Sequence, residues 1–227
     1  MKDRAYNQQD PGQSLLIHYL TLRKSIGILG IFLPFVLVFG VRILTNCHIL
    51  QDSISDYYYT KMGHYMTGTL CAVSLFLFSY KGYDKRDLWA GRAASIFALG
   101  VAFFPCSNYL PLSECKVLEL KGNDIINYIH FGCAALLFLV FAYYCLILFT
   151  QTSGHPTKAK RKRNRVYKVC GIIILLCIIL LLLYSVIPAL HKQFKAYKPI
   201  FWLEALALLA FGLSWLTKGE ALFPDKK

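Results

Sequence analysis

The chain has 227 residues, of which 56% are hydrophobic and only 16% are charged. A soluble domain usually carries about a quarter of charged residues, so this composition excludes an ordinary soluble globular protein. The formal net charge is +13, and most of the basic residues flank apolar segments. A basic run in that position indicates membrane topology, so we expect no nucleic-acid partner.

The apolar residues are gathered into six segments, at residues 25–45, 62–80, 88–105, 125–150, 169–190 and 200–216. Each is close to the ~20 residues that a helix rising ~1.5 Å per residue needs to cross a ~30 Å hydrocarbon layer. We therefore predict an all-α integral membrane protein. It would be a single bundle of six transmembrane helices (25–216) between an N-terminal segment (1–24) and a C-terminal tail (217–227).

Basic residues are distributed unevenly between the two predicted sides of the membrane. Residues 1–24, 81–92, 151–168 and 217–227 lie on one side and hold 18 of the 25 lysines and arginines. Acidic residues are divided equally, six on each side. The positive-inside rule then predicts that both termini are cytoplasmic and that residues 46–61 form the first outer loop.

Three ionisable residues are predicted to lie at one depth below the outer surface. The second, fourth and sixth helices would run inward, which places His64, His130 and Glu204 about one turn, ~5.4 Å, below that surface. Ionisable side chains inside membrane spans are costly and usually face the protein interior. Small residues share the helix faces of both histidines, so we expect both histidines to point into the bundle.

The outer loop "DSISDYYYT" (52–60) lies above this layer and adds polar groups to it. The candidate catalytic residues are Asp56, His64, His130 and Glu204. The candidate ligand-binding residues are the same four with Arg42, Ser55 and Tyr57. In the first hypothesis this layer is a lipid-binding pocket in which Arg42 or Lys192 faces a headgroup phosphate.

Two further hypotheses use the same residues for chemistry or transport. In the second, the protein is an intramembrane hydrolase or acyl-transfer enzyme acting on a lipid, with His130 or Asp56 as the base. Zinc is a candidate cofactor there, held by His64, His130 and Glu204 with an open position for water. The third hypothesis, an ion or proton conduit, ranks last because the inner halves of these helices are almost wholly apolar.

A purely structural interpretation of the outer loop is also open. Ser53 and Asp56 match the [ST]-x-x-[DE] capping pattern, so they would cap the start of the second helix. Tyr57, Tyr58, Tyr59 and Tyr65 suit an aromatic belt at the membrane interface. Together these two roles explain the loop without any function.

Three of the eight cysteines lie outside the predicted spans, on the outer side. Disulfides form where the environment is oxidising, which applies to that side of the membrane. Only eight residues lie between Cys106 and Cys115, so we name them as the disulfide candidate. That pairing leaves Cys47 without a partner.

Short motifs in three parts of the chain occur in a recognisable order. They are "SISDYYYT" (53–60), "IHFGCAALLF" (129–138) and "EALALLAFGLSWLTKG" (204–219). The chain resembles the six-span group that includes the DRAM and Sfk membrane proteins, the GPI-anchor lipid-remodelling proteins and bacterial membrane families of unknown function. In that group an "ISD" element, an H-x-x-x-A start to the fourth helix and an early carboxylate in the sixth helix recur in this order. The matching positions here are Ser55, Asp56, His130, Ala134 and Glu204.

The resemblance implies a fold of six spans and work on lipids or lipid-anchored molecules near the outer leaflet. The short outer loop and its tyrosine run are closest to the bacterial branch of the group, which implies a location in a bacterial inner membrane. Membrane lipids are the expected partners, and assembly into a homo-oligomer is left open.

Overall fold

The computed structural model describes residues 11–45, 47–82, 84–106, 115, 117–118, 123–152 and 154–224, with side chains from residue 18 onward. Every regular element in these residues is helical. The elements are α1 (Pro11–Leu44), η1 (a 3₁₀ turn, Ser55–Tyr59), α2 (Gly63–Ser79), α3 (Lys85–Phe103), α4 (Asp124–Tyr143), η2 (a π turn, Tyr144–Leu148), α5 (Lys158–Val186), α6 (Pro188–Phe194), η3 (Lys195–Tyr197) and α7 (Pro199–Lys218). The predicted all-α class is confirmed.

Four stretches of helix are long and apolar enough to cross a membrane. They are His18–Leu44, Asp124–Leu148, Lys158–Val186 and Pro199–Lys218. The other two predicted spans correspond to α2, which has 17 residues, and to α3, which begins with three charged residues. The structure therefore supports an integral membrane protein, while the count of six spans stays a prediction.

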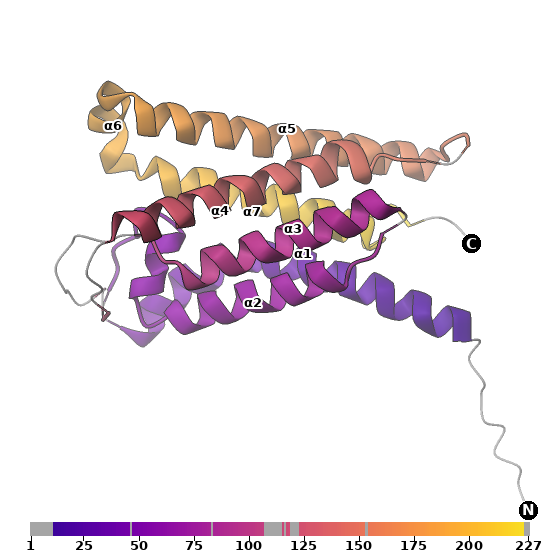
Figure 1. The fold of residues 1–227 in the computed structure, drawn as a ribbon, viewed down its shortest axis with the longest axis horizontal. Coiled ribbons are helices and arrows are strands. Elements are labelled where there is room, and N and C mark those ends of the chain that lie inside the picture. The colour runs from indigo at the N-terminus through magenta and orange to yellow at the C-terminus, as the bar shows by residue number, and fades with distance from the viewer. Residues whose placement is uncertain are drawn as a thin grey trace, which may run out of the picture.

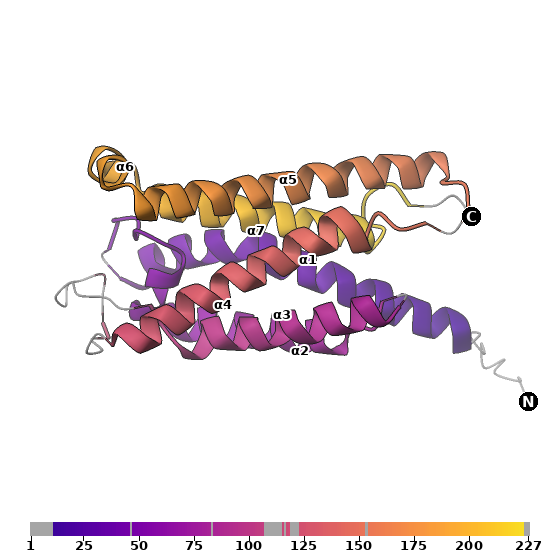
Figure 2. The same cartoon turned by 45° about the horizontal axis from the view of Figure 1, so that its top comes forward.

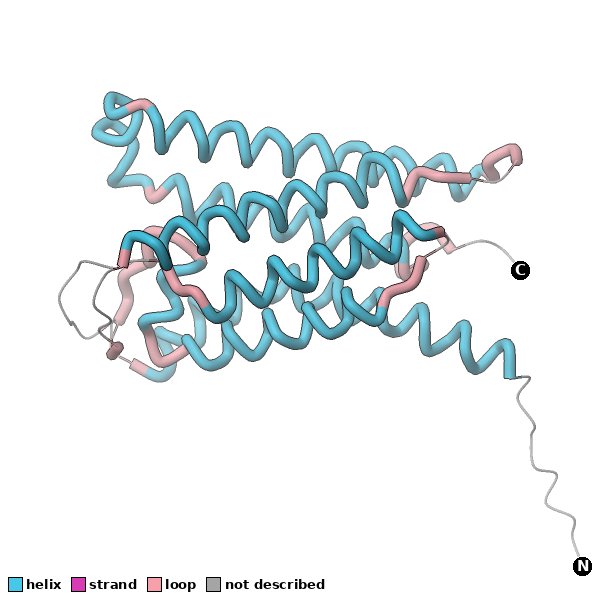
Figure 3. The backbone as a smooth tube through the Cα atoms, viewed as in Figure 1, coloured by secondary structure: helices cyan, strands magenta, loops and turns pink. Residues whose placement is uncertain are grey.

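The six long helices form a closed ring. Neighbours in contact are α1 with α2, α2 with α3, α3 with α4, α4 with α5, α5 with α7, and α7 with α1. Figures 1 and 2 show these helices running along one common axis, with α6 lying across one end. Loops gather at the two ends of the bundle (Figure 3). We name them the η1 end, which carries η1 and α6, and the basic end, where α1 begins and α7 ends.

Two helix boundaries differ from the prediction because of local capping and proline. The stretch 151–168 was predicted to be a loop, but α5 already begins at Lys158, where the Thr157 hydroxyl accepts a hydrogen bond from the Lys160 amide at 3.0 Å. The span predicted at 169–190 ends at Val186. The residue before a proline is pushed into an extended conformation, so Ile187 leaves the helix and Pro188 starts α6.

The first and last helices are joined by a contact between two glycines. A Cβ atom built on Gly27 would lie 2.7 Å from the carbonyl oxygen of Gly212, and one built on Gly212 would lie 2.5 Å from the carbonyl oxygen of Gly27. The two backbones therefore approach without an intervening side chain, as small residues allow between helices in lipid. This glycine contact closes the ring.

We expect Gly212→Leu to lower stability by about 1–3 kcal/mol, because the added side chain forces α1 and α7 apart. Thermal unfolding of the protein purified in detergent measures the effect as a lower Tm. Gly132→Leu in α4 is the matched control, since a Cβ there meets nothing within 4 Å. Equal melting temperatures for the two variants would contradict the glycine contact.

Candidate functional site

The loop between α1 and α2 folds back over the η1 end and is held by two reciprocal hydrogen bonds. The Asp56 amide donates to the Ser53 hydroxyl at 3.0 Å, and the Ser53 amide donates to the Asp56 carboxylate at 3.1 Å. This is the predicted capping pattern. It lies at the start of η1, however, and not at the start of the second helix as predicted, because α2 begins only at Gly63. The loop is thus a separate turn that covers the ring.

A serine and a histidine meet beneath this turn. The Ser55 hydroxyl lies 3.0 Å from Nε2 of His130, and Nδ1 of His130 lies 2.7 Å from the carbonyl oxygen of Phe104. A carbonyl only accepts hydrogen bonds, so Nδ1 carries the proton and Nε2 is left to accept from Ser55. His130 is only 2% exposed, which confirms that it points into the bundle.

Glu204, in the second turn of α7, ties the same turn to a second helix of the ring. Its carboxylate accepts a hydrogen bond from the Ile54 amide at 2.7 Å. Ile54 precedes Ser55, so residues adjacent in the loop are bound by helices α4 and α7. The structure therefore brings His130 and Glu204 to the same turn, as predicted for these two residues, and it adds Ser55 of the loop to their layer.

Asp56 faces the thiol of Cys106, a residue that lies shortly after the end of α3. Sγ of Cys106 donates to the Asp56 carboxylate at 3.8 Å. Burial raises the pKa of the Cys106 thiol, and the negative charges of Asp56 and Glu204 raise it further. The thiol therefore stays protonated at neutral pH, and Cys106 is no nucleophile there.

The predicted disulfide between Cys106 and Cys115 is wrong, because Cys115 is bonded to Cys47. The amides of Val117 and Leu118 donate to the Tyr59 carbonyl at 2.9 and 3.2 Å, which holds the chain after Cys115 against the η1 loop. The disulfide then joins that chain to the residues that follow α1. Short spacing in the sequence suggested the wrong partner.

His64 does not belong to the site. Its side chain is exposed, whereas α2 buries Met66, Thr69 and Val73. Each helical residue turns ~100°, so His64 lies roughly 200° from Met66. The prediction that both histidines point inward is wrong for His64.

The predicted zinc ligands are consequently not assembled. With His64 facing outward, His130 and Glu204 lack the third ligand that was proposed. Within the part of the chain that the structure describes, no three His, Cys, Asp or Glu side chains are grouped to hold a metal ion. We derive no reaction step through zinc.

The cations near the layer also differ from expectation. Arg42 is exposed, and no ion pair joins it to a carboxylate among the described residues. Lys192 is exposed on α6. The cation that sequence reasoning missed is Lys198, whose ammonium lies 3.2 Å from Asp52. Its only signal was its position directly before Pro199, at the start of α7.

The tyrosine run is not a belt facing the membrane interface. Tyr57 and Tyr59 are 1% and 2% exposed, while Tyr58 is half-buried. Burial raises the pKa of Tyr57, and a hydrogen bond from the Gln51 backbone and the charge of Arg42 act in the opposite direction. The Tyr57 ring packs against Phe201, 6.3 Å between centroids. These rings therefore form the core of the loop.

An apolar groove lies between α1 and α7, on the outside of the ring near the η1 end. Its volume is about 490 Å³. The lining residues are apolar except for one arginine: Pro34, Phe35, Val38, Phe39, Arg42, Leu50, Phe201, Trp202, Ala205, Leu206 and Leu209. Arg42 is the last of these along α1 and marks the end of the groove nearest the loop.

The chain matches no family model, no curated protein and no solved structure.

We expect peptide mapping under non-reducing conditions to recover Cys47 joined to Cys115. Cys106 should be recovered as a free thiol that reacts slowly with alkylating reagents, because burial and nearby carboxylates keep it protonated. Cys47→Ser is the control and should release Cys115 for alkylation. A peptide joining Cys106 to Cys115 would contradict the structure.

Proposed function

We propose that the protein is a six-span bacterial inner-membrane protein that binds a phosphate-bearing lipid at its outer face. The basic end would face the cytoplasm, because 18 of the 25 lysines and arginines belong to the segments on that side. The η1 end would then lie at the outer leaflet. In this orientation the groove between α1 and α7 opens to the lipids of that leaflet.

The groove is the observation that carries the proposal. It offers apolar walls for an acyl chain and, at its outer rim, the positive charge of Arg42 for a headgroup phosphate; among the described residues no carboxylate pairs with Arg42. From Pro34 to Arg42 the helix rises roughly 12 Å, enough for part of one chain. An arginine guanidinium is well suited to phosphate because it presents several donors in one plane. The arrangement fits an amphipathic ligand lying along the helices.

The layer beneath η1 supports the same proposal. Ser55, His130 and Glu204 come from distant parts of the sequence, yet they bind one turn of the chain. These are positions that carry the resemblance to lipid-remodelling membrane proteins. Their meeting at the predicted outer face favours a role for that face in lipid handling.

We expect Arg42→Gln to weaken binding of an anionic phospholipid about tenfold or more, because a charge-assisted contact with phosphate is lost. Displacement of a fluorescent phospholipid from the protein in detergent micelles measures this affinity. Lys61→Gln is the matched control, an exposed cation at the same end that lies outside the groove. Equal affinity for the two variants would refute the groove as the lipid site.

The contact between Ser55 and His130 favours a second candidate function, acyl transfer or hydrolysis of a lipid ester. A hydroxyl aimed at a histidine that a third group orients is the arrangement of an activated nucleophile. In such a reaction the Ser55 oxygen would attack the ester carbonyl while Nε2 of His130 takes the hydroxyl proton. The leaving alcohol would then receive that proton, and water or a second alcohol would release the acyl group.

Under this second function, Ser55→Ala and His130→Gln would each lower turnover at least about a thousandfold. Release of fatty acid from a short-chain phospholipid in mixed micelles measures the rate. His64→Gln should leave the rate unchanged, because His64 faces away from the layer. Wild-type turnover in folded Ser55→Ala would rule out this function and leave lipid binding in place.

A conduit for ions or protons receives no comparable support. Towards the basic end from His130, α4 buries Leu137, Phe141 and Ala142. These three side chains are apolar, so this stretch of α4 buries no polar group for a path from His130.

A further inference from the structure

A second apolar groove lies between α5 and α7, in the half of the bundle nearer the basic end. Its volume is about 380 Å³. Its apolar walls include Val169 and Ile173 of α5 with Leu206 and Leu213 of α7. Val169, Leu206 and Leu213 are 51%, 46% and 39% exposed, so this α5–α7 groove opens on the outside of the ring. Arg165 is the first lining residue along α5 and marks the end of the groove nearest the start of that helix.

Arg165 belongs to a row of exposed cations on the outer side of α5. The members of this outer basic row are Lys158, Arg161, Arg165 and Lys168. They follow one another at steps of three or four residues, which places them on one face of the helix. Residues 125–203 contain no aspartate or glutamate, so no acid of the same helix alternates with them. Like charges at this spacing repel one another and destabilise a helix. The row therefore favours an anionic surface as its neighbour.

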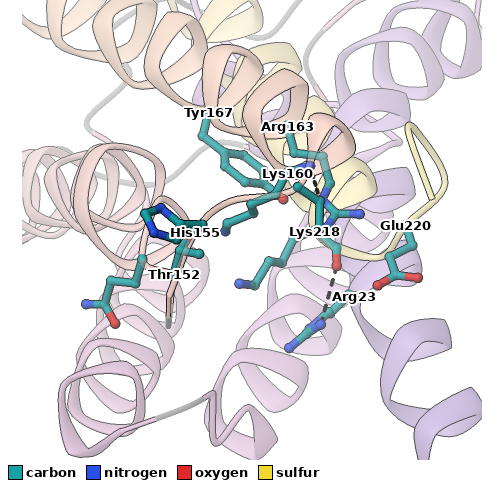
Figure 4. Close-up of a pocket in the computed structure, with 10 residues that line it drawn as sticks. Arg23, Thr152, His155, Lys160, Arg163, Tyr167, Lys218 and Glu220 are labelled. Carbon is teal, nitrogen blue, oxygen red and sulfur yellow. Dashed lines mark hydrogen bonds between the residues drawn. The ribbon is translucent and has the colours of Figure 1, made fainter. Parts of the chain in front are cut away.

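Two other cations of α5 point inward and have a structural role. Lys160 and Arg163 line a cavity at the basic end (Figure 4). Arg23 of α1 and Lys218 of α7 line the same cavity from neighbouring helices. The Lys160 ammonium donates to the Phe149 carbonyl at 2.7 Å, and Arg163 is only 8% exposed. The basic residues of α5 thus divide into an inward pair that the fold holds and an outer row that faces the surroundings.

The depth of the outer basic row favours lipid headgroups as that anionic surface. From Val169 to Val186, α5 carries no charged residue, which is the length of a membrane span. Lys168 directly precedes this stretch, and Arg165 lies about 4.5 Å further out. The headgroup region extends about 5–8 Å beyond the hydrocarbon core on each side. Both cations therefore lie at headgroup depth, where anionic lipids of the cytoplasmic leaflet attract basic residues.

We propose that the α5–α7 groove binds an anionic phospholipid of the cytoplasmic leaflet, with part of an acyl chain between the helices and the headgroup at Arg165 and Lys168. The guanidinium presents several donors to phosphate in one plane, and Lys168 adds a second positive charge about one turn away. A headgroup with a net negative charge is therefore held more tightly than a zwitterionic one. The leaflet follows from the membrane orientation proposed above, whereas the site itself does not depend on the groove between α1 and α7.

Native mass spectrometry of the full chain from detergent micelles measures its affinity for phosphatidylglycerol and for phosphatidylcholine with identical acyl chains. All proteins carry Arg42→Gln, so that the groove between α1 and α7 contributes equally to each. We expect phosphatidylglycerol to bind more tightly than phosphatidylcholine. Arg165→Gln should weaken phosphatidylglycerol binding about tenfold, because a charge-assisted contact is lost. Lys81→Gln is the matched control, since it removes one positive charge from an exposed side chain at the basic end, outside the groove.

Val169→Phe tests the groove separately from the charge. Val169 is half-exposed, so a larger side chain there narrows the groove without changing the core of the bundle. We expect this variant to weaken the binding of both lipids alike, because their acyl chains are the same. Unchanged melting temperatures would show that the variants are folded. Equal affinity of the Arg42→Gln protein for the two lipids, equal losses in Arg165→Gln and Lys81→Gln, or unchanged affinities in Val169→Phe would overturn the proposal.

Discussion

Gly27 and Gly212 allow the backbones of α1 and α7 to meet, and both proposed lipid grooves use α7 as a wall. Towards the η1 end, the same two helices flank the first of these grooves. Towards the basic end, Arg23 lies about one helical turn before Gly27. It donates a hydrogen bond to the Lys218 carbonyl. Leu206 and Leu209 of α7 line both grooves, so the helix that closes the ring is also the wall that they share.

The two ends of the ring are closed by different chemistry. At the η1 end a short turn is bound by side chains from α4 and α7, and a disulfide holds the adjoining chain. At the basic end, cations are held by backbone carbonyls and aromatic rings. The first arrangement joins a histidine and a carboxylate to groups of one turn, whereas the second gathers basic side chains around a cavity.

Hydropathy was enough to predict the long helices, because an apolar segment of nearly twenty residues has few stable conformations other than a helix in a membrane. It also placed His130 and Glu204 at one level, since depth follows from the rise per residue. Hydropathy did not predict the orientation of His64. Small and polar residues lie on two sides of α2, so the sequence did not show which side of this helix faces the interior. The partner of Cys115 and the cavity around Lys218 depend on contacts between distant segments, and no local pattern carries that information.

The pairing of the first helix with the last bears on how the chain assembles during synthesis. A membrane protein is inserted from its N-terminus, so α1 enters the bilayer while α7 has still to be made. The surface around Gly27 must meanwhile contact lipid or the machinery that inserts the chain. Arg23 likewise has to wait for the Lys218 carbonyl that later accepts its hydrogen bond. Ring closure therefore has to wait until α7 is made, and a truncation that removes α7 would leave the first helix without its main neighbour.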